Sequence, residues 1–327
     1  MSSFALATYK DVSGPRAGLV LDGKLLDLEA VHRAAGRPLG KGAAAPMTVD
    51  ALLAAWPEVE RPLARLAARG AELLSTGRIQ PVPRGGSRLL APLTPRRIFC
   101  AAANYREHAQ EMGSALAAKS QSKPYFFLKL PENVIAPGAA VMIPPESAQV
   151  DWEVELGVVI GRRGRRIPAA RALDHVAGYT IVNDVSARDC NMRSDYPFKF
   201  DWFHGKCFET FAPVGPWLVP RSCIADPQKL RMRLAVNDEV MQDSDTGKMI
   251  FDVREQIEYL SCILTLEPGD LIATGTPTGV GMARGIFLKP GATMTAGIEG
   301  LGTLTTPVRA ERVRDGAPRL NVRPRTV

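Results

Sequence analysis

The sequence of 327 residues contains no apolar run that approaches the roughly 20 residues needed for a membrane-spanning helix. Its first residues also lack the charged start, long apolar core and cleavage site of a secretory signal peptide. No internal repeat or low-complexity tract is visible. From these absences we expect a cytoplasmic globular protein that has no membrane partner.

Cysteine is also scarce, and the excess charge is modest. The five cysteines are scattered, odd in number and without a C-x-x-C pair, which argues against both a disulfide framework and a zinc site. The net charge of +7 comes largely from dispersed arginines, with one cluster at residues 162–166 that has no interleaved aromatic residues. We therefore expect a solvated turn there and no nucleic-acid partner, although a mildly basic enzyme favours anionic substrates.

Prolines and glycines concentrate between residues 80 and 95, where regular structure is interrupted. Before them, residues 4–28 predict short strands, and residues 27–35 and 49–74 predict amphipathic helices. After residue 98, short apolar stretches predict strands, with helices expected at residues 105–118, 169–175, 187–193 and 253–264. We predict an α+β, mainly β fold, with a small N-terminal domain and linker over residues 1–90 and a catalytic domain over residues 91–327. Asn237 and Asp238 predict a hairpin turn.

Two glutamates at strand spacing are the most informative feature of the sequence. Side chains at i and i+2 share one face of a strand, so Glu153 and Glu155 project together while Trp152 and Val154 pack on the other side. Asp184 ends a second apolar strand and could add a third oxygen. An all-oxygen cluster suits a hard divalent ion such as Mg²⁺, Mn²⁺ or Ca²⁺. The alternative is the solvated face of an edge strand, but the apolar run to residue 160 favours a strand buried on both faces.

Six ordered motifs give the chain a resemblance to the fumarylacetoacetate hydrolase family. The resemblance runs from about Arg97 to Val308. The motifs are Asn104-Tyr105-Arg106-Glu107-His108, the Glu153/Glu155 pair, Asn183-Asp184-Val185-Ser186-Ala187-Arg188-Asp189, Gly205-Lys206-Cys207-Phe208, Phe211-Ala212-Pro213-Val214-Gly215-Pro216 and Thr274-Gly275-Thr276-Pro277-Thr278-Gly279-Val280-Gly281. The resemblance implies a mixed β-roll, a homodimer and a bound divalent ion, Mg²⁺ or Mn²⁺ rather than Ca²⁺.

The resemblance also implies roles for individual residues. Glu153, Glu155 and Asp184 would be the metal ligands. His108 and Glu111, three positions apart on one helical face, would form a water-activating pair in which the glutamate orients the imidazole.

Further roles follow from the same family motifs. Lys206 would complete the catalytic group. Arg188, Gly275, Thr276 and Asn191 would contact the substrate, although Asn191 stands where many relatives have Gln, one methylene longer. From the residues alone, Lys206 would be a surface lysine, Arg188 an ion-pair partner of an acid such as Asp189, and the Gly-Thr-Pro segment a plain tight turn. The aromatic segment from residue 192 to 204 could shape the pocket or an interface.

The implied substrate is a small 2-oxo acid, and three functions compete. We expect a hydrolase that cleaves a C–C bond of an acylpyruvate such as fumarylpyruvate or maleylpyruvate, releasing pyruvate in aromatic-compound catabolism. A metal-bound 2-oxo group would be the electron sink for this cleavage. The second possibility is an isomerase or decarboxylase of a 2-oxo dicarboxylate, such as 2-hydroxyhepta-2,4-diene-1,7-dioate or oxaloacetate, at the same site. The third is a binding protein with a structural metal.

Overall fold

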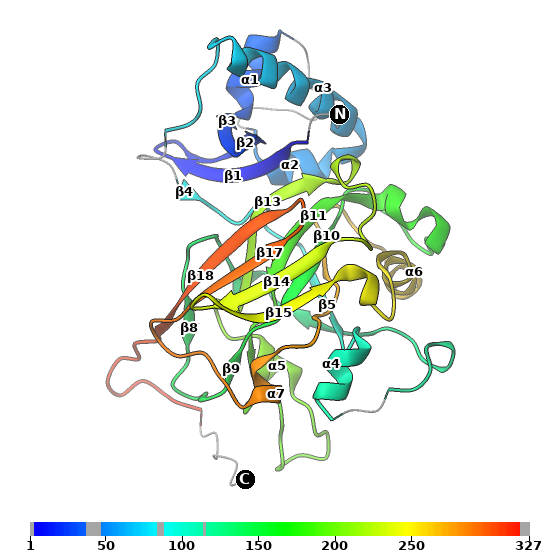
Figure 1. Cartoon of the computed structure of the whole chain (residues 1–327), viewed down its shortest axis with the longest axis vertical. Helices are drawn as coiled ribbons and strands as arrows, with labels where there is room; N and C mark the ends of the chain where they lie inside the picture. Colours follow the sequence, from blue (N-terminus) through cyan, green and yellow to red (C-terminus); the bar gives the residue numbers. More distant parts are fainter. Residues whose placement is uncertain (1–2, 37–46, 84–87, 114–115, 321–327) are drawn as a thin grey trace.

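The computed structural model of the protein describes residues 3–36, 47–83, 88–113 and 116–320. Figure 1 shows the N-terminal helices packed at one end of the molecule and two β-sheets in its centre. Short helices lie at the opposite end, below the sheets. The fold is mixed and strand-rich, as the sequence predicted. None of the helices in the described ranges is long and apolar enough to cross a membrane.

The larger sheet joins the N-terminal strands to the rest of the chain. Its order is β3-β2-β1-β13-β11-β10-β16-β5-β6, with β4 added to β1 and β7 to β13. The bounds are β1 (Ala5–Asp11), β2 (Gly14–Leu21), β3 (Lys24–Asp27), β4 (Arg88–Leu89), β5 (Ile98–Ala102), β6 (Tyr125–Lys129), β7 (Val134–Ile135), β10 (Val154–Ile160), β11 (Val176–Asn183), β13 (Ala212–Pro220) and β16 (Leu271–Ala273). Because Leu6 pairs with Leu218, the sheet runs on from the N-terminal region without a break. The predicted boundary near residue 90 stays a prediction, and residues 84–87 of the predicted linker lie outside the described residues.

The second sheet has five strands in the order β15-β14-β17-β18-β8. They are β8 (Val141–Ile143), β14 (Arg231–Val236), β15 (Glu239–Asp245), β17 (Thr293–Ile298) and β18 (Gly302–Ala310), and a separate pair is formed by β9 (Val150–Asp151) and β12 (Ser186–Ala187). The predicted hairpin between β14 and β15 is confirmed, with positive φ at Asn237 and Asp238. Leu156 and Ile181 of the larger sheet share one hydrophobic core with Leu234 of the second.

The helices cover the ends and edges of the sheets. They are α1 (Leu28–Ala35), α2 (Val49–Ala54), α3 (Trp56–Ser75), α4 (Arg106–Glu111), α5 (Trp202–Lys206), α6 (Val253–Ile263) and α7 (Gly281–Arg284), with 3₁₀ turns at Lys119–Gln121, Pro131–Asn133, Ala169–His175, Arg221–Cys223 and Thr246–Lys248. Asp27 caps α1 by accepting a hydrogen bond from the Ala30 N–H, and Asp252 and Glu255 form a capping box at the start of α6.

The predicted helix at residues 187–193 is wrong. Ser186 and Ala187 form strand β12, and turns follow it. The Asp189 carboxylate there accepts hydrogen bonds from the Ser147 hydroxyl and the Ala148 N–H, so tertiary contacts override the local helical pattern.

Other predicted helices exist with different bounds. The helix predicted at residues 105–118 ends at Glu111, and residues 114 and 115 of that prediction lie outside the described residues. Residues 169–175 form a 3₁₀ helix. The helix predicted at residues 49–74 divides at Ala55, just before Trp56 and Pro57 begin α3.

Candidate active site

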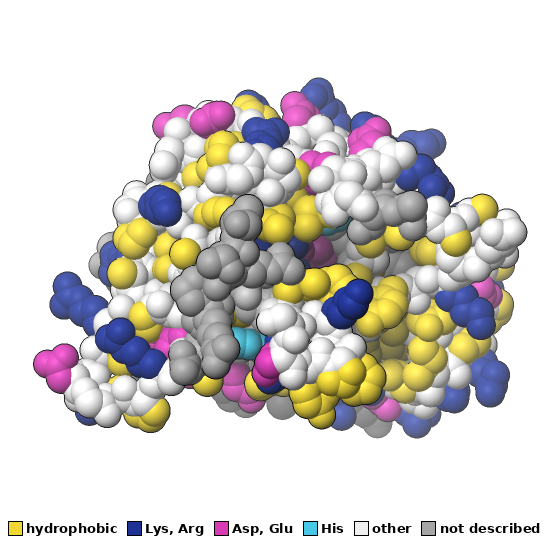
Figure 2. Space-filling view, turned by 90° about the horizontal axis from the view of Figure 1, so that it is seen from below, with side chains coloured by type: hydrophobic (Ala, Val, Ile, Leu, Met, Phe, Trp, Pro, Cys, Tyr) yellow, Lys and Arg dark blue, Asp and Glu magenta, His cyan; other side chains and the backbone are white. Residues whose placement is uncertain are grey.

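A cavity of about 620 Å³ lies at the end of the molecule where α4, α5 and α7 gather. Figure 2, which views the molecule from this side, shows a hollowed face with hydrophobic side chains around the hollow. The cavity is lined by residues that lie far apart in the sequence, from β5, α4, β6, β10, α5 and the turn after β16. Most of the site residues predicted from sequence therefore line the same cavity.

Three carboxylates meet on one wall of this cavity. Glu153 directly precedes β10, Glu155 is the second residue of that strand, and Asp184 directly follows β11. Because Glu155 pairs with Val182 in the antiparallel register, both strands bring their carboxylates to the same edge. One ligand oxygen from each of the three lies within 4.8 Å of the others, and all three side chains are buried. The cluster predicted from the i and i+2 spacing is present, and the edge-strand alternative is excluded because β10 lies between β11 and β16.

Two buried cations neutralise Glu153. The Lys206 ammonium on α5 lies 2.7 Å from Glu153 Oε2 and 2.7 Å from Asp184 Oδ2. The Arg188 guanidinium donates to Asp151 Oδ2 at 2.8 Å and to Glu153 Oε1 at 2.5 Å. Burial alone would raise the pKa of Glu153, but Lys206 and Arg188 hold that pKa well below its ordinary value. Lys206 is therefore a buried site residue, and Arg188 pairs with Asp151 and Glu153 instead of Asp189.

A second lysine, Lys129 at the end of β6, lies beside Asp184 but does not line the cavity. Its ammonium donates to the backbone carbonyls of Val185, Lys206 and Phe211, at 2.5 to 2.9 Å, and lies 2.9 Å from Asp184 Oδ1. Since three carbonyls use the three donors of the ammonium, Asp184 Oδ1 is buried beside a positive charge without accepting a hydrogen bond.

Glu155 has no cation partner among the described side chains. Its Oε2 accepts a hydrogen bond from the Gly275 N–H at 2.8 Å. Burial, together with the negative charges of Asp184 and Glu153, raises the pKa of Glu155 well above its ordinary value. The carboxylate oxygens of Glu155 and Asp184 thus keep acceptor capacity that the protein leaves unused. The trio could hold a divalent ion, and its all-oxygen donor set fits a hard cation.

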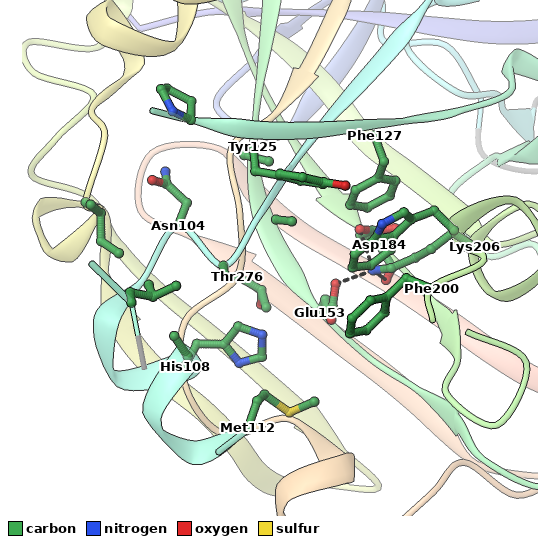
Figure 3. Close-up of a pocket in the computed structure, with 18 of the residues that line it drawn as sticks. Asn104, His108, Met112, Tyr125, Phe127, Glu153, Asp184, Phe200, Lys206 and Thr276 are labelled. Carbon is green, nitrogen blue, oxygen red and sulfur yellow. Dashed lines mark hydrogen bonds and ion pairs between the residues drawn. The ribbon is translucent and has the colours of Figure 1, made fainter. Parts of the chain in front are cut away.

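His108 and Glu111 form a hydrogen-bonded pair on α4. Nδ1 of His108 lies 2.8 Å from Glu111 Oε1. Glu111 also accepts hydrogen bonds from the Thr278 hydroxyl, at 2.5 Å, and from the Gly279 N–H, at 2.9 Å. Burial raises the pKa of Glu111, but these three donors outweigh it and lower that pKa below the ordinary value. Figure 3 shows the His108 ring directed into the cavity that Glu153 and Lys206 also line.

The turn after β16 contacts both the carboxylate trio and the His108–Glu111 pair. The Thr276 hydroxyl donates to the Val154 carbonyl and accepts from Gln242, so its donor is used inside the protein. The N–H of Gly275 is likewise used, by Glu155. The turn that carries Gly275 and Thr276 thus orients Glu155 of the carboxylate trio and, through Thr278 and Gly279, also orients Glu111.

Asn191 also lines the cavity, next to α5. Its Oδ1 is buried and accepts no hydrogen bond from the described residues. A Cβ on Gly205 would come within 1.6 Å of this oxygen, so the glycine of the Gly205-Lys206 motif is required by close packing. The amide of Asn191 therefore packs directly against α5 at Gly205.

Sequence reasoning missed three residues that hold the site together. Asp151 accepts from the backbone N–H groups of Gly281 and Met282 as well as from Arg188. Gln242 and Lys129 are fully buried side chains at the inward positions of their strands. A polar residue on the apolar face of a strand was the available signal, since such a group is retained only with partners.

The chain is similar in sequence and in structure to several known proteins. Residues 97–309 match the family described as fumarylacetoacetate (FAA) hydrolase C-terminal. Oxaloacetate tautomerase Fahd2a, mitochondrial, from Rattus norvegicus is 39% identical over 261 residues, covering 77% of this chain and 81% of the relative. Oxaloacetate tautomerase FAHD2B, mitochondrial, from Bos taurus is 38% identical over 296 residues, covering 88% of this chain and 92% of the relative. The structure of 5-carboxymethyl-2-hydroxymuconate delta-isomerase from Mycobacterium smegmatis aligns with a TM-score of 0.69 and 30% identity, covering 94% of this chain and 100% of that one.

These relatives overturn the predicted reaction. The C–C hydrolysis of an acylpyruvate, and with it the hydrolase class, is wrong, because the curated relatives are tautomerases and the structural relative is an isomerase. They agree with the second reading, an isomerase of a 2-oxo dicarboxylate. The error has a chemical reason. Both reactions use an enolate next to a bound 2-oxo group, so the motifs that supply this site are common to both.

Proposed function

This chain belongs to the fumarylacetoacetate hydrolase family, and we propose that it is a metal-dependent tautomerase of a 2-oxo acid, with oxaloacetate as the first substrate to test. The observation that carries the proposal is the placement of His108, held by Glu111, in one cavity with the buried trio Glu153, Glu155 and Asp184. A proton acceptor beside an oxygen-rich cation site is what the keto–enol exchange of a 2-oxo acid requires.

The exchange breaks one C–H bond and forms one O–H bond. With its Nδ1–H donated to Glu111, His108 keeps the lone pair of Nε2 for the proton on C3, the carbon next to the 2-oxo group. The electrons of that bond form the C2=C3 double bond, and the imidazolium returns the proton to the 2-oxo oxygen. Glu111 stabilises the imidazolium meanwhile, because its lowered pKa keeps it ionised. A divalent ion held by the trio would polarise the 2-oxo group as a Lewis acid.

The buried cations suit an anionic substrate. Lys206 and Arg188 line the cavity and offset Glu153 and Asp184, whose charges would otherwise repel a carboxylate. Mg²⁺ and Mn²⁺ are both proposed as the ion, since both accept carboxylate oxygens. A homodimer is also proposed, and the molecular mass in solution tests it.

The first experiment follows the ultraviolet absorbance of enol oxaloacetate as it converts to the keto form. The enzyme is assayed with Mg²⁺, with Mn²⁺ and with EDTA, against the spontaneous rate in the same buffer. We expect the ion to accelerate conversion and EDTA to return the rate to the spontaneous one. Pyruvate and CO₂ are measured in parallel, and their release at the rate of enol loss would contradict tautomerisation.

A histidine variant tests the proton acceptor. His108→Gln removes the basic nitrogen and should lower the rate at least about a hundredfold, the lower end for a general base. His175→Gln is the matched control, because His175 lies outside the cavity and contacts the Arg162 carbonyl. Full activity in His108→Gln would rule out the assigned role.

A further inference from the structure

The two ends of the cavity differ in chemistry. The inner end holds the carboxylate trio, Lys206 and Arg188. The outer end is aromatic and apolar, with Tyr125, Phe200 and Trp202 as its largest side chains, and the buried Phe127 lies between Trp202 and Lys206, whose ammonium is 5.0 Å from the centre of the Phe127 ring. Figure 3 shows Tyr125, Phe127 and Phe200 around the space that His108 faces.

The aromatic side chains form a stack with exposed ring surface. The Trp202 ring lies 4.8 Å from that of Phe127 and 5.4 Å from that of Phe200, with interplanar angles of 8° in both pairs. Phe200 is 57% exposed and Tyr125 is 59% exposed, so their rings can still bury area against a ligand. An ordered stack that ends in an exposed ring suits another flat ring.

The size of the cavity exceeds what oxaloacetate needs. Even if each non-hydrogen atom of oxaloacetate took up about 30 Å³, as a water molecule does, the substrate would fill less than half of the 620 Å³. Its two carboxylates would remain with the charged inner groups. The aromatic end would then stay in contact with water.

The charges at the outer end argue against a distant carboxylate. Of the cations that line the cavity in the described part of the chain, Lys206 and Arg188 pair with carboxylates at the inner end, and Lys123 is exposed at the mouth. A carboxylate against the ring faces of Phe200 and Trp202 would lose hydration, because a ring face offers no hydrogen-bond donor in exchange. An uncharged planar group loses nothing there.

We propose that the preferred substrate is an arylpyruvate, a 2-oxo acid whose C3 carries an aromatic ring that stacks on Phe200. This rests on the proposed tautomerase function and names its substrate class. The reaction stays balanced, since the C3–H bond breaks and the O–H bond of the enol forms, with no further reactant. The enol double bond is conjugated with the ring, so the flat product also matches the stack.

The test compares phenylpyruvate with oxaloacetate, both supplied as enols with the same divalent ion. We expect kcat/KM for phenylpyruvate to exceed that for oxaloacetate by about tenfold or more, which is about 1.4 kcal/mol. Equal or lower kcat/KM for phenylpyruvate, with oxaloacetate turned over, would overturn the arylpyruvate preference and leave the tautomerase function standing.

Two phenylalanine variants test whether the aromatic ring of the substrate stacks on Phe200. Phe200→Leu should lower the ratio of the two kcat/KM values about fivefold, mostly through KM for phenylpyruvate. Phe198→Leu is the matched control, because Phe198 lies in the same segment, is 74% exposed and does not line the cavity. Equal ratios in the wild type and in Phe200→Leu would overturn the assignment.

A binding measurement separates the substrate class from catalysis. Benzoylformate and glyoxylate are 2-oxo acids that have no C–H bond on a carbon attached to the oxo carbon, so neither can tautomerise, and only benzoylformate carries a ring. Calorimetric titration with Mg²⁺ present should show benzoylformate binding at least about tenfold more tightly than glyoxylate. This result without turnover of either enol would end the tautomerase proposal and keep the aromatic subsite, whereas equal or absent binding would overturn the subsite.

Discussion

Two groups of ionised side chains in this protein carry the same surplus of one negative charge, and they differ in their access to water. In the N-terminal region, three carboxylates surround two arginines; these are Asp11, Asp27, Glu29, Arg16 and Arg33. In the cavity wall and directly behind it, four carboxylates surround three cations, and we call these seven residues the cavity group; they are Asp151, Glu153, Glu155, Asp184, Lys129, Arg188 and Lys206.

Exposure decides what the surplus charge does. The three N-terminal carboxylates are 18 to 33% exposed, so water offsets the unpaired charge. The ion-paired side chains of the cavity group are at most 8% exposed, and the surplus falls on Glu155, whose pKa rises. Only a proton or a bound cation can neutralise it. The N-terminal group can thus contribute to stability without a ligand, and the cavity group could hold a cation.

The largest expected effect comes from removing one cation in each group. Lys206→Met leaves Glu153 and Asp184 buried without their shared partner and should lower the free energy of unfolding by about 3–5 kcal/mol. Arg16→Met removes a partly exposed partner and should cost about 1 kcal/mol or less. Urea unfolding of both variants without divalent ions measures the difference. Equal losses would break the contrast between the groups.

The next effect concerns the surplus charge itself. Glu155→Gln removes one proposed ligand while relieving the repulsion among the buried carboxylates. We expect stability close to that of the wild type without metal, and loss of the gain of about 2.7 kcal/mol that a ligand at 100 times its Kd gives. Thermal unfolding with and without Mn²⁺ measures this gain. Glu29→Gln, in the N-terminal group, should keep the full gain, and a full gain in Glu155→Gln would remove Glu155 from the ligand set.

A smaller effect tests the N-terminal group by pH. Burial raises the pKa of Asp27, but hydrogen bonds from Arg16, Tyr9 and the Ala30 N–H outweigh it and lower that pKa. The unfolded chain, with an ordinary value of about 3.9, therefore binds the proton more readily, so this contribution is present at neutral pH and is lost as pH falls through the folded pKa. Asp27→Asn should be about 1 kcal/mol less stable at pH 7. Urea unfolding should show the gap closing below pH 4, and a constant gap would contradict the assignment.

The comparison also shows which features the sequence could predict. Glu153 and Glu155 were predictable as a pair because strand geometry alone places i and i+2 on one face. The buried character of their strand followed from its unbroken apolar run. The joining of β1 to β13 has no such local signal, since it brings Leu6 beside Leu218.

The partners of the charged residues were harder to predict. Arg188 pairs with Asp151 and Glu153, although the neighbouring Asp189 was the nearer candidate in sequence. Lys129 and Gln242 act through backbone groups of distant segments, and no periodicity identifies these contacts. The reaction could not be read from the motifs either, because hydrolases and isomerases of this family share them.

The last effect is on catalysis and concerns Glu111, a half-buried carboxylate that has three donors and no permanently charged cation beside it among the described side chains. Thr278→Val keeps the side-chain volume and removes the hydroxyl that donates to Glu111 Oε2. His108 and the Gly279 N–H remain as donors, so Glu111 stays ionised at neutral pH and its pKa moves back towards the ordinary value.

Loss of a net hydrogen bond of about 0.5–1.5 kcal/mol corresponds to a decrease in kcat of about two- to tenfold, with little change in KM. Enol oxaloacetate conversion measures both, with Glu111→Gln as the reference for complete loss of the charge. If Thr278→Val were as slow as Glu111→Gln, the single hydroxyl would matter as much as the whole carboxylate charge, and the assigned role of that charge in stabilising the His108 imidazolium would be wrong.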